Sequence, residues 1–172
     1  YWYDYKGNDW SWFKIIEIKT LKRILLIGAS GFIGRYCYKK LKSNLTDFEL
    51  IGTFCKNPSP ELINLDYTNL NLFNQILNKV APDIIIWTAG IKDLSITEHN
   101  NFSSEEHNEL PISQILKYQN EINKLTHLIF VSSDYVFNGI KGNYRSTDSP
   151  CPNTYYGKSK YNTEKIIARN NK

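Results

Sequence analysis

Short apolar runs alternate with longer amphipathic stretches along the chain from about residue 22 onward. Four of these runs are rich in branched or aromatic side chains and are bounded by glycine or polar residues, a pattern typical of strands buried on both faces of a sheet. They are Arg23–Gly28, Phe48–Phe54, Ile84–Trp87 and Leu128–Val131. We therefore predict four strands that belong to one sheet.

The stretches between and after these runs have a helical periodicity of apolar positions. The predicted helices are Phe32–Leu41, Asn69–Val80, Glu105–Lys124 and Tyr155–Ala168, and Pro111 is expected to make the third irregular near its start. Strands that alternate with helices form parallel sheets with right-handed crossovers. The fold class that follows is α/β, a Rossmann-like doubly wound parallel sheet.

The composition fits one globular domain. The chain has 172 residues, of which 41% are hydrophobic and 22% are charged, and this excludes a disordered tail, a collagen-like repeat and a disulfide-stapled miniprotein. Cys37, Cys55 and Cys151 are too few and too scattered for a disulfide framework or a zinc site, so we expect a reducing, cytoplasmic compartment. No apolar run is long enough to span a bilayer, so no membrane association is expected.

Charge and histidine spacing add two negative expectations. The net charge of +4 is spread along the chain, so we expect no nucleic-acid partner. The three histidines, His99, His107 and His127, do not have the spacing of metal ligands, so no metal site is expected.

The first 20 residues differ from the rest of the chain. They are rich in tyrosine, tryptophan and phenylalanine, which occur there without a clear period. The chain does not begin with methionine. We interpret residues 1–20 as an aromatic-rich leader or the end of a preceding domain. An exposed aromatic surface for a partner is the alternative. Residues 21–172 form the predicted α/β domain.

A glycine turn joins the first predicted strand to the first predicted helix. Gly28, Gly31 and Gly34 have the spacing G-x-x-G-x-x-G, in which the glycines allow a tight turn, close approach of a pyrophosphate and close packing of the helix. The N-terminus of the helix offers free N–H groups to the phosphates. The turn therefore predicts that residues 21–172 are an NAD(P)-binding domain. The predicted cofactor-binding residues of the turn are Gly28, Ser30, Gly31, Phe32, Ile33 and Gly34.

The second predicted strand indicates which dinucleotide is bound. NAD sites usually carry Asp or Glu at its end, whereas this strand is followed by Cys55 and Lys56. Lys56, and Arg35 in the first helix, are basic residues suited to neutralise a 2′-phosphate. We therefore expect NADP(H), with NAD(H) as the alternative.

Catalytic side chains follow the fourth strand and open the last helix. Ser133 comes at the end of a strand, where open α/β sheets bind their ligands. Tyr156 and Lys160 are four residues apart, so they share one face of the predicted helix, and an ammonium beside a phenol lowers the pKa of the phenol. The neighbouring Tyr155 lacks a lysine four residues further on. We predict that Ser133 binds a substrate oxygen and that Tyr156 transfers its proton.

These motifs resemble the extended short-chain dehydrogenase/reductases, and within them the dTDP-4-dehydrorhamnose reductase family. The resemblance covers about residues 22–170 and is most specific at Asp134-Tyr-Val-Phe-Asn-Gly139. It also rests on the glycine turn, Leu65-Asp66, the segment Pro82–Gly90, and Pro150 through Lys160.

The resemblance implies further residue roles and a reaction. It implies that Asn108 supports the active-site lysine through water, that Asp66 contacts the adenine, and that Asp134 and Tyr135 face the sugar. Tyr67, next to Asp66, is also expected to bind the cofactor. Thr88, Ala89 and Gly90 would line the cofactor channel, Lys160 would orient the nicotinamide ribose, and Tyr156 would also contact the cofactor. The implied reaction is hydride transfer from NADPH to the 4-keto group of a nucleotide-linked deoxy-sugar.

Two departures from the family keep other interpretations open. Ile91–Glu106 lacks the acidic pattern of the reductases, and the chain ends 12 residues after Lys160. We therefore expect that the C-terminal substrate region has no counterpart here and that the chain is part of a larger enzyme. The alternatives are a nucleotide-sugar epimerase or dehydratase and a non-catalytic NADP-binding regulatory subunit. A homodimer or a fusion with an upstream domain is compatible with each.

Overall fold

A parallel sheet forms the centre of the structure, a computed structural model that describes residues 21–44, 46–91, 101–122 and 126–170. Five strands lie in the order β3-β2-β1-β4-β5, and all four neighbouring pairs are parallel. Their bounds are β1 Lys22–Ile27, β2 Phe48–Phe54, β3 Ile63–Asn64, β4 Ile84–Trp87 and β5 His127–Phe130. The chain order reverses between β1 and β4, which is where doubly wound sheets bind their ligands.

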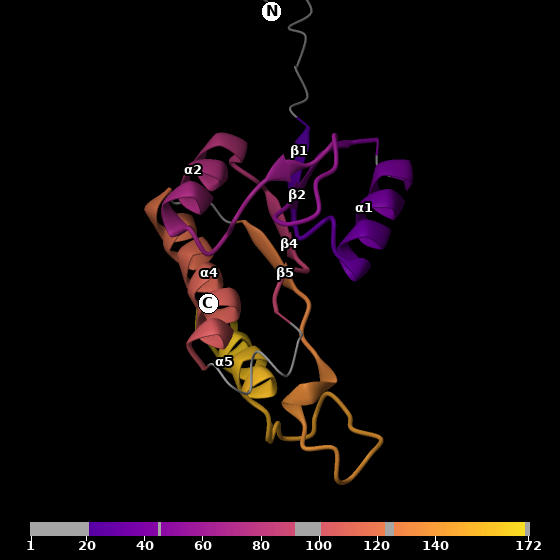
Figure 1. Ribbon diagram of the computed structural model, residues 1–172, viewed down its shortest axis with the longest axis vertical. Coiled ribbons are helices and arrows are strands. Elements are labelled where there is room, and N and C mark those ends of the chain that lie inside the picture. Colours follow the sequence, from indigo (N-terminus) through magenta and orange to yellow (C-terminus); the bar gives the residue numbers. More distant parts are fainter. Residues whose placement is uncertain (1–20, 45, 92–100, 123–125, 171–172) are drawn as a thin grey trace, which may run out of the picture.

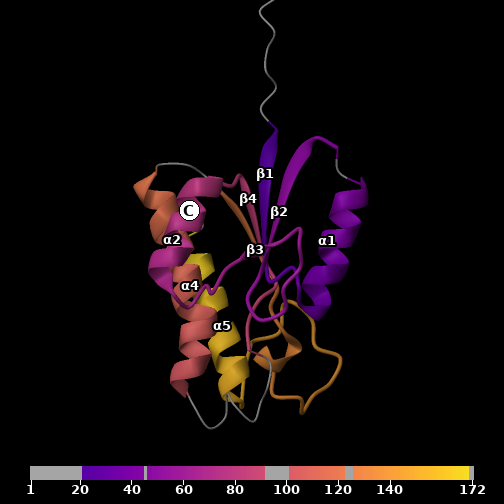
Figure 2. The ribbon, with the colours of Figure 1, turned by 45° about the horizontal axis from the view of Figure 1, so that its top comes forward.

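Helices cover both faces of this sheet, as the prediction of a doubly wound fold requires. Figures 1 and 2 show α1 (Phe32–Asn44) on one side and α2 (Leu70–Val80), α4 (Asn101–Glu121) and α5 (Tyr155–Asn170) on the other. A short 3₁₀ helix, η1 (Asp134–Val136), follows β5. The predicted α/β fold is thereby confirmed.

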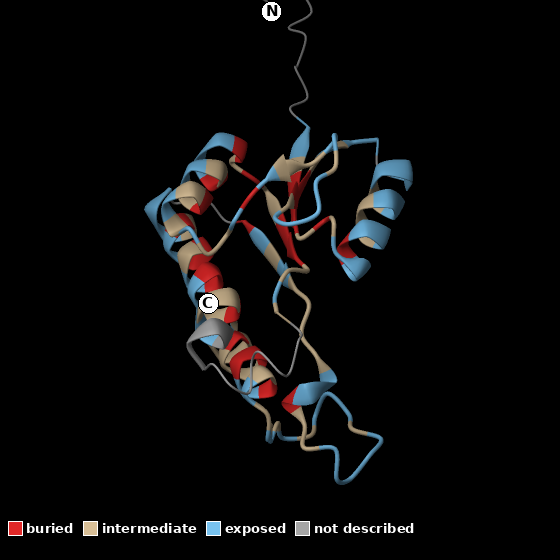
Figure 3. Cartoon of the chain, in the orientation of Figure 1, coloured by how far each residue is buried: buried red, intermediate tan, exposed pale blue. Residues whose placement is uncertain are grey.

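The core is divided into two clusters by the sheet. Leu25 and Ile27 of β1 pack with the cluster that includes residues of α2 and α4, whereas Ile24 and Leu26 pack with the cluster on the α1 side. This alternation follows from the two-residue period of a strand. All four side chains are at most 3% exposed, and Figure 3 shows the buried positions along the strands and on the inner faces of the helices.

The number of strands and the start of one helix differ from the prediction. Four strands were expected, and the fifth is β3, which has two residues of which Asn64 is exposed, so it leaves no periodic pattern. The helix expected at Glu105–Lys124 is α4, which begins at Asn101 and ends at Glu121. Pro111 therefore lies in the middle of α4 and not near its start. Because proline has no N–H, it leaves the carbonyl of His107 without its helical donor.

The carboxyl ends of β1, β2, β4 and β5 meet at one edge of the sheet because the strands are parallel. The segments that follow these strands contain the residues predicted for cofactor binding and catalysis, so the fold brings them to one edge. Within the described part of the chain, no helix has the length and apolar character needed to cross a membrane.

Candidate functional site

The glycine turn after β1 is held by its own backbone and by a neighbouring strand. Gly28 has a φ of 85°, which favours glycine, and its carbonyl accepts a hydrogen bond from the Gly31 N–H at 2.9 Å. The Gly28 N–H donates to Thr53 Oγ1 of β2 at 3.1 Å. A Cβ at Gly34 would collide with the Gly28 carbonyl and lie 2.7 Å from Thr88 Oγ1. Only glycine therefore lets the first turn of α1 pack this closely against β1 and β4.

A cavity of about 290 Å³ lies at this edge of the sheet. Its walls come from the segments that follow four strands and from α4. Of the residues predicted to bind the cofactor, those that line it are Gly28, Ser30, Gly31, Lys56, Asp66, Tyr67, Thr88, Ala89 and Gly90. Of the others, Phe32 and Ile33 are 80% and 54% exposed on α1, and Gly34 is buried beneath the turn. Tyr156 and Lys160, on α5, do not line the cavity. Arg35, the second candidate for the 2′-phosphate, is exposed and does not line the cavity.

Three residues that sequence reasoning did not assign to the cofactor also line the cavity: Cys55, Ile91 and His107. His107 Nδ1 lies 3.3 Å from the Tyr67 hydroxyl, and the Tyr67 ring packs edge to face on Trp87 at 5.0 Å. Burial lowers the pKa of His107, and the same effect raises the pKa of Tyr67, so both side chains are neutral near pH 7. The spacing of the histidines carries no signal for this contact, whereas the position of His107 next to Asn108 on one helix does.

Ser133 and Tyr156 come together from two elements. The Ser133 hydroxyl caps η1 by accepting from the Tyr135 N–H at 3.3 Å, and it donates to Asp134 Oδ1 at 3.2 Å. The Tyr156 ring meets the Tyr135 ring edge to face at 5.6 Å. A Cβ at Gly157 would collide with the Tyr135 carbonyl, so the glycine after Tyr156 allows α5 to approach η1.

The direction of the Tyr156 pKa differs from the sequence expectation. Burial of the ring raises the pKa of Tyr156, and a hydrogen bond with Ser133 opposes that rise. An effect of Lys160 was expected to lower it. Desolvation dominates because the half-buried phenol loses water on the side where a phenolate would need it. Tyr156 is accordingly a neutral phenol at neutral pH.

Lys160 is a buried ammonium held by three groups. The residue is 4% exposed, and its Nζ donates to the Val131 carbonyl at 3.3 Å. Nζ also lies 4.6 Å from the centre of the Phe130 ring and 5.9 Å from that of Tyr156. Burial lowers the pKa of Lys160 to about 8. Tyr155 is 39% exposed with Lys158 Nζ over its ring, so Tyr156 is the tyrosine beside Lys160.

Gly90 connects the cavity to this lysine. Gly90 lines the cavity, and a Cβ built on it would lie 2.8 Å from Asn108 Oδ1 and 3.5 Å from Lys160 Nζ. Asn108 is fully buried on α4. The segment after β4 therefore comes close to both α4 and α5 at Gly90, where the absence of a side chain leaves room for the Asn108 amide. Among the residues the structure describes, no group of three or more His, Cys, Asp or Glu side chains is placed to hold a metal ion.

Comparison with known proteins decides the family. A family model described as the RmlD substrate binding domain matches residues 22–172. The chain belongs to this family. The predicted resemblance to the dTDP-4-dehydrorhamnose reductases is confirmed.

The curated relatives that the chain resembles have names that describe different functions. Methionine adenosyltransferase 2 subunit beta of Bos taurus is 29% identical over 150 residues, which are 87% of this chain and 44% of that protein. The dTDP-4-dehydrorhamnose reductase of Aggregatibacter actinomycetemcomitans is 29% identical over 148 residues, 86% of this chain and 47% of that protein. The chain thus spans less than half the length of the curated relatives it matches.

Solved structures agree with the sequence comparison. A hypothetical dTDP-4-dehydrorhamnose reductase from Sulfolobus tokodaii superimposes with a TM-score of 0.75 at 30% identity, over 84% of this chain and 51% of that one. The dTDP-4-dehydrorhamnose reductase of Bacillus anthracis, solved in complex with NADP, has a TM-score of 0.67 at 23% identity, over 86% of this chain and 49% of that one. At 23% identity, the similarity to the Bacillus anthracis enzyme shows a shared fold alone.

Proposed function

We propose that the protein binds NADPH and reduces the 4-keto group of a nucleotide sugar. The observation that carries the proposal is the meeting of Ser133, Tyr156 and Lys160 at the strand ends, next to the cavity that begins at the glycine turn. The cavity suits the pyrophosphate of a dinucleotide because Gly28 and Gly31 expose backbone at the start of α1, where phosphates are stabilised by helix N–H groups. When bound, NADPH supplies the hydride.

The residues of the cavity have distinct roles in holding this cofactor. The glycine turn binds the pyrophosphate, Lys56 neutralises the 2′-phosphate, and Asp66 with Tyr67 contacts the adenine. Thr88, Ala89 and Gly90 line the path toward Lys160, which binds the nicotinamide ribose. Asn108, which lies with Lys160 beside Gly90, supports the lysine from α4 through water. His107 orients Tyr67 through the contact between its ring nitrogen and the phenol.

The reaction itself needs one proton, and Tyr156 supplies it. Its raised pKa keeps the phenol protonated near pH 7, as a proton donor requires. Ser133 donates a hydrogen bond to the keto oxygen, on which negative charge develops. The Lys160 ammonium stabilises the phenolate that remains, and Asp134 and Tyr135 contact the sugar.

Lys56 provides a direct test of the cofactor assignment. We expect Lys56→Ala to weaken NADPH binding about fivefold and to leave NADH binding unchanged, because an exposed charge pair contributes about 1 kcal/mol and only NADPH carries the 2′-phosphate. Both affinities are measured by fluorescence titration, with Lys79→Ala, at the far end of α2, as the matched control. Equal affinities of the unmodified chain for NADPH and NADH would contradict the assignment to NADP.

The buried ammonium of Lys160 predicts a pH dependence. Since burial lowers its pKa to about 8, kcat/KM is expected to fall as pH rises through about 8 and the ammonium is lost. Phe130→Leu removes the ring that stabilises the charged form, so the fall should move to lower pH by up to about one unit. Ile129→Leu, on the exposed side of the same strand, is the control and should leave the profile in place. A profile that Phe130→Leu does not move would exclude this role of the ring.

The lowered pKa of Lys160 also predicts that stability rises with pH, whereas kcat/KM falls. The folded chain holds the Lys160 proton less tightly than the unfolded chain does. The contribution of Lys160 to the free energy of unfolding therefore increases as pH rises from about 8 to 10.5. A reductase step that needs the ammonium therefore loses rate in the range in which the fold gains stability.

A second candidate function is a non-catalytic subunit that binds NADP and a partner enzyme. The observation in its favour is the 29% identity to a protein named as subunit beta of a methionine adenosyltransferase. The two candidates differ in one measurement, the consumption of NADPH with dTDP-4-dehydrorhamnose by the full-length protein. Turnover supports the reductase. Tight NADPH binding without turnover, together with a change in methionine adenosyltransferase activity, supports the subunit. Interconversion of sugar epimers without net NADPH consumption would indicate the epimerase alternative.

A further inference from the structure

Beyond its first turn, α1 presents an exposed face that the proposed function does not use. No other helix of the described chain lies against the outer side of α1 (Figures 1 and 2). Its inner side chains, Cys37, Tyr38 and Leu41, have helical spacing and pack with the core cluster on this side of the sheet. Figure 3 shows that most of the helix is exposed. We name the following exposed side chains the α1 face: Arg35, Tyr36, Lys39, Lys40, Lys42 and Ser43.

The α1 face is basic, and most of its charge is not neutralised. Helix α1 contains four basic residues and no acidic residue. Lys42 Nζ bonds Glu61 Oε1 at 2.7 Å. The other three cations, Arg35, Lys39 and Lys40, form no ion pair with any residue that the structure describes. The face therefore carries an excess of positive charge.

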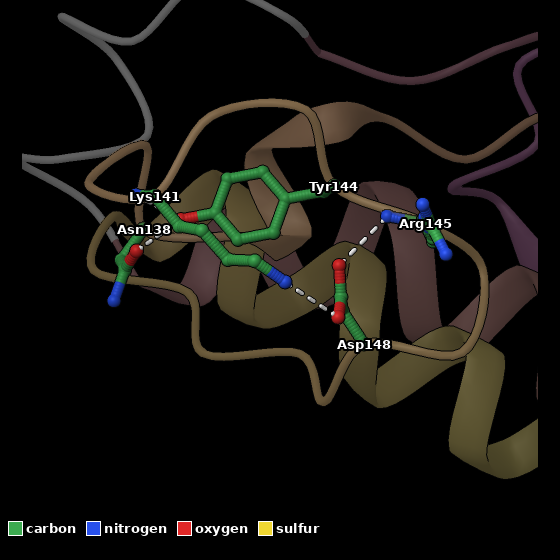
Figure 4. Close-up of polar contacts among 5 residues, drawn as sticks. All are labelled: Asn138, Lys141, Tyr144, Arg145 and Asp148. Carbon is green, nitrogen blue, oxygen red and sulfur yellow. Dashed lines mark hydrogen bonds and ion pairs between the residues drawn. The ribbon is translucent and has the colours of Figure 1, made fainter.

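Two lysines elsewhere on the molecule show the contrast. Lys141 Nζ bonds Asp148 Oδ1 at 2.8 Å, and Asp148 Oδ2 accepts from the Arg145 N–H at 2.8 Å (Figure 4). The bond with Lys141 holds the pKa of Asp148 below its usual value, so this pair stays ionised and its charges cancel. On α4, Lys117 Nζ lies 3.7 Å from Glu121 Oε1. The three cations of the α1 face have no such counter-charge, so they attract an anionic ligand.

A cavity of about 330 Å³ opens between α1 and the segment that follows β2. We name it the α1 hollow, and its lining residues are Tyr38, Lys39, Lys42, Ser43 and Glu61. It shares no lining residue with the cofactor cavity. Its ammonium and hydroxyl groups are hydrogen-bond donors that can bind a carboxylate, and the Tyr38 ring adds an apolar wall. The hollow is thus suited to a single acidic side chain.

An exposed aromatic ring lies next to these charges. Tyr36 is 67% exposed, and Lys40 Nζ lies 5.8 Å from the centre of its ring. Tyrosine and arginine are among the residues that contribute most to binding energy at protein interfaces. The combination of an exposed tyrosine, an arginine and lysines therefore favours a protein partner that is negatively charged.

We propose that the α1 face binds an acidic segment of another protein. The cations attract its carboxylates, the α1 hollow receives one acidic side chain, and Tyr36 packs against an apolar part of the segment. This binding needs neither the cofactor nor turnover, so it is independent of the proposed reductase activity.

Two features favour a protein segment over other anionic partners. The Glu61 carboxylate in the α1 hollow would repel the regularly spaced phosphates of a nucleic acid, whereas a peptide can place a neutral side chain there. A polar hollow beside a single exposed ring offers little apolar surface for insertion into a lipid bilayer.

The test is fluorescence anisotropy of the full-length protein with a labelled peptide in which glutamate alternates with tyrosine. We expect a Kd on the order of 100 μM at low salt. Affinity should fall about tenfold as ionic strength rises from about 0.05 to 0.5 M, because exposed charge pairs are screened. The control peptide carries glutamine in place of glutamate. Equal binding of the two peptides, or tighter binding of single-stranded DNA or of phosphatidylserine vesicles, would overturn the proposal.

Matched variants locate the binding on α1. Lys39→Glu replaces an attraction with a repulsion and is expected to weaken peptide binding about tenfold. Tyr36→Ser removes the exposed ring and should weaken it about threefold or more. Lys79→Glu, exposed on α2, makes the same change in net charge and is expected to leave the affinity unchanged. A fluorescence titration with NADPH checks that each variant is folded. Equal losses in Lys39→Glu and Lys79→Glu, or no loss in either α1 variant, would refute the assignment.

Discussion

Tyr156→Phe is expected to lower kcat by about 10²- to 10⁴-fold while NADPH affinity stays nearly unchanged. The substitution removes only the phenolic oxygen, which is the proposed proton donor, and keeps the ring that packs edge to face on Tyr135. Lys160 keeps its hydrogen bond to the Val131 carbonyl, so the proposed ribose contact remains. The measurement is NADPH consumption with dTDP-4-dehydrorhamnose by the full-length protein, next to a fluorescence titration with NADPH.

The neighbouring tyrosine provides the control for this experiment. Tyr155 precedes Tyr156 on α5, is 39% exposed and has Lys158 over its ring. Tyr155→Phe should leave both kcat and NADPH affinity unchanged. If Tyr156→Phe keeps its activity, or if Tyr155→Phe is the inactive variant, the assignment of the proton donor is wrong. A loss of NADPH affinity in Tyr156→Phe would instead indicate a structural role.

Gly34→Ala is expected to abolish NADPH binding and to lower the free energy of unfolding by about 3 kcal/mol. The added Cβ would collide with the Gly28 carbonyl, which is backbone and cannot rotate away, and would lie 2.7 Å from Thr88 Oγ1. Helix α1 must then move away from β1 and β4. That movement displaces the N–H groups at the start of α1 from the position in which they meet a pyrophosphate.

Chemical denaturation and NADPH titration measure the two effects of Gly34→Ala. Lys39→Ala, an exposed position on the same helix, is the control and should change neither quantity. A Gly34→Ala protein with wild-type stability and affinity would show that α1 does not need this close contact. Lost affinity with full stability would show that the contact serves the cofactor alone.

Local patterns predicted most of the fold, and the exceptions have physical causes. The apolar run Arg23–Gly28 predicted β1 because a strand covered on both faces must be apolar throughout. β3 was missed because two residues carry no period, and its place next to β2 comes from pairing with Thr53 and Phe54. The sequence predicted that this helix starts at Glu105 because no apolar pattern precedes Glu105. In the structure, α4 begins at Asn101.

The sequence predicted which side chains lie near one another better than it predicted their pKa values. The spacing of Tyr156 and Lys160 predicted that they share a face of a helix, and the structure places Lys160 Nζ 5.9 Å from the Tyr156 ring. Spacing contains no information on solvent, so the rise in the Tyr156 pKa and the fall in that of Lys160 were not predicted. His107 was overlooked because its contact with Tyr67 spans 40 positions in the chain.

The sequence by itself therefore determined the α/β order of the elements, the glycine turn and the face shared by Tyr156 and Lys160. These depend on spacing within single elements, and spacing is a property of the chain. Only the tertiary structure decided the burial of Lys160 against Phe130 and the close approach of Gly90 to Asn108. Each of these is a contact between elements, and desolvation, which sets both pKa values, arises only when the elements pack together.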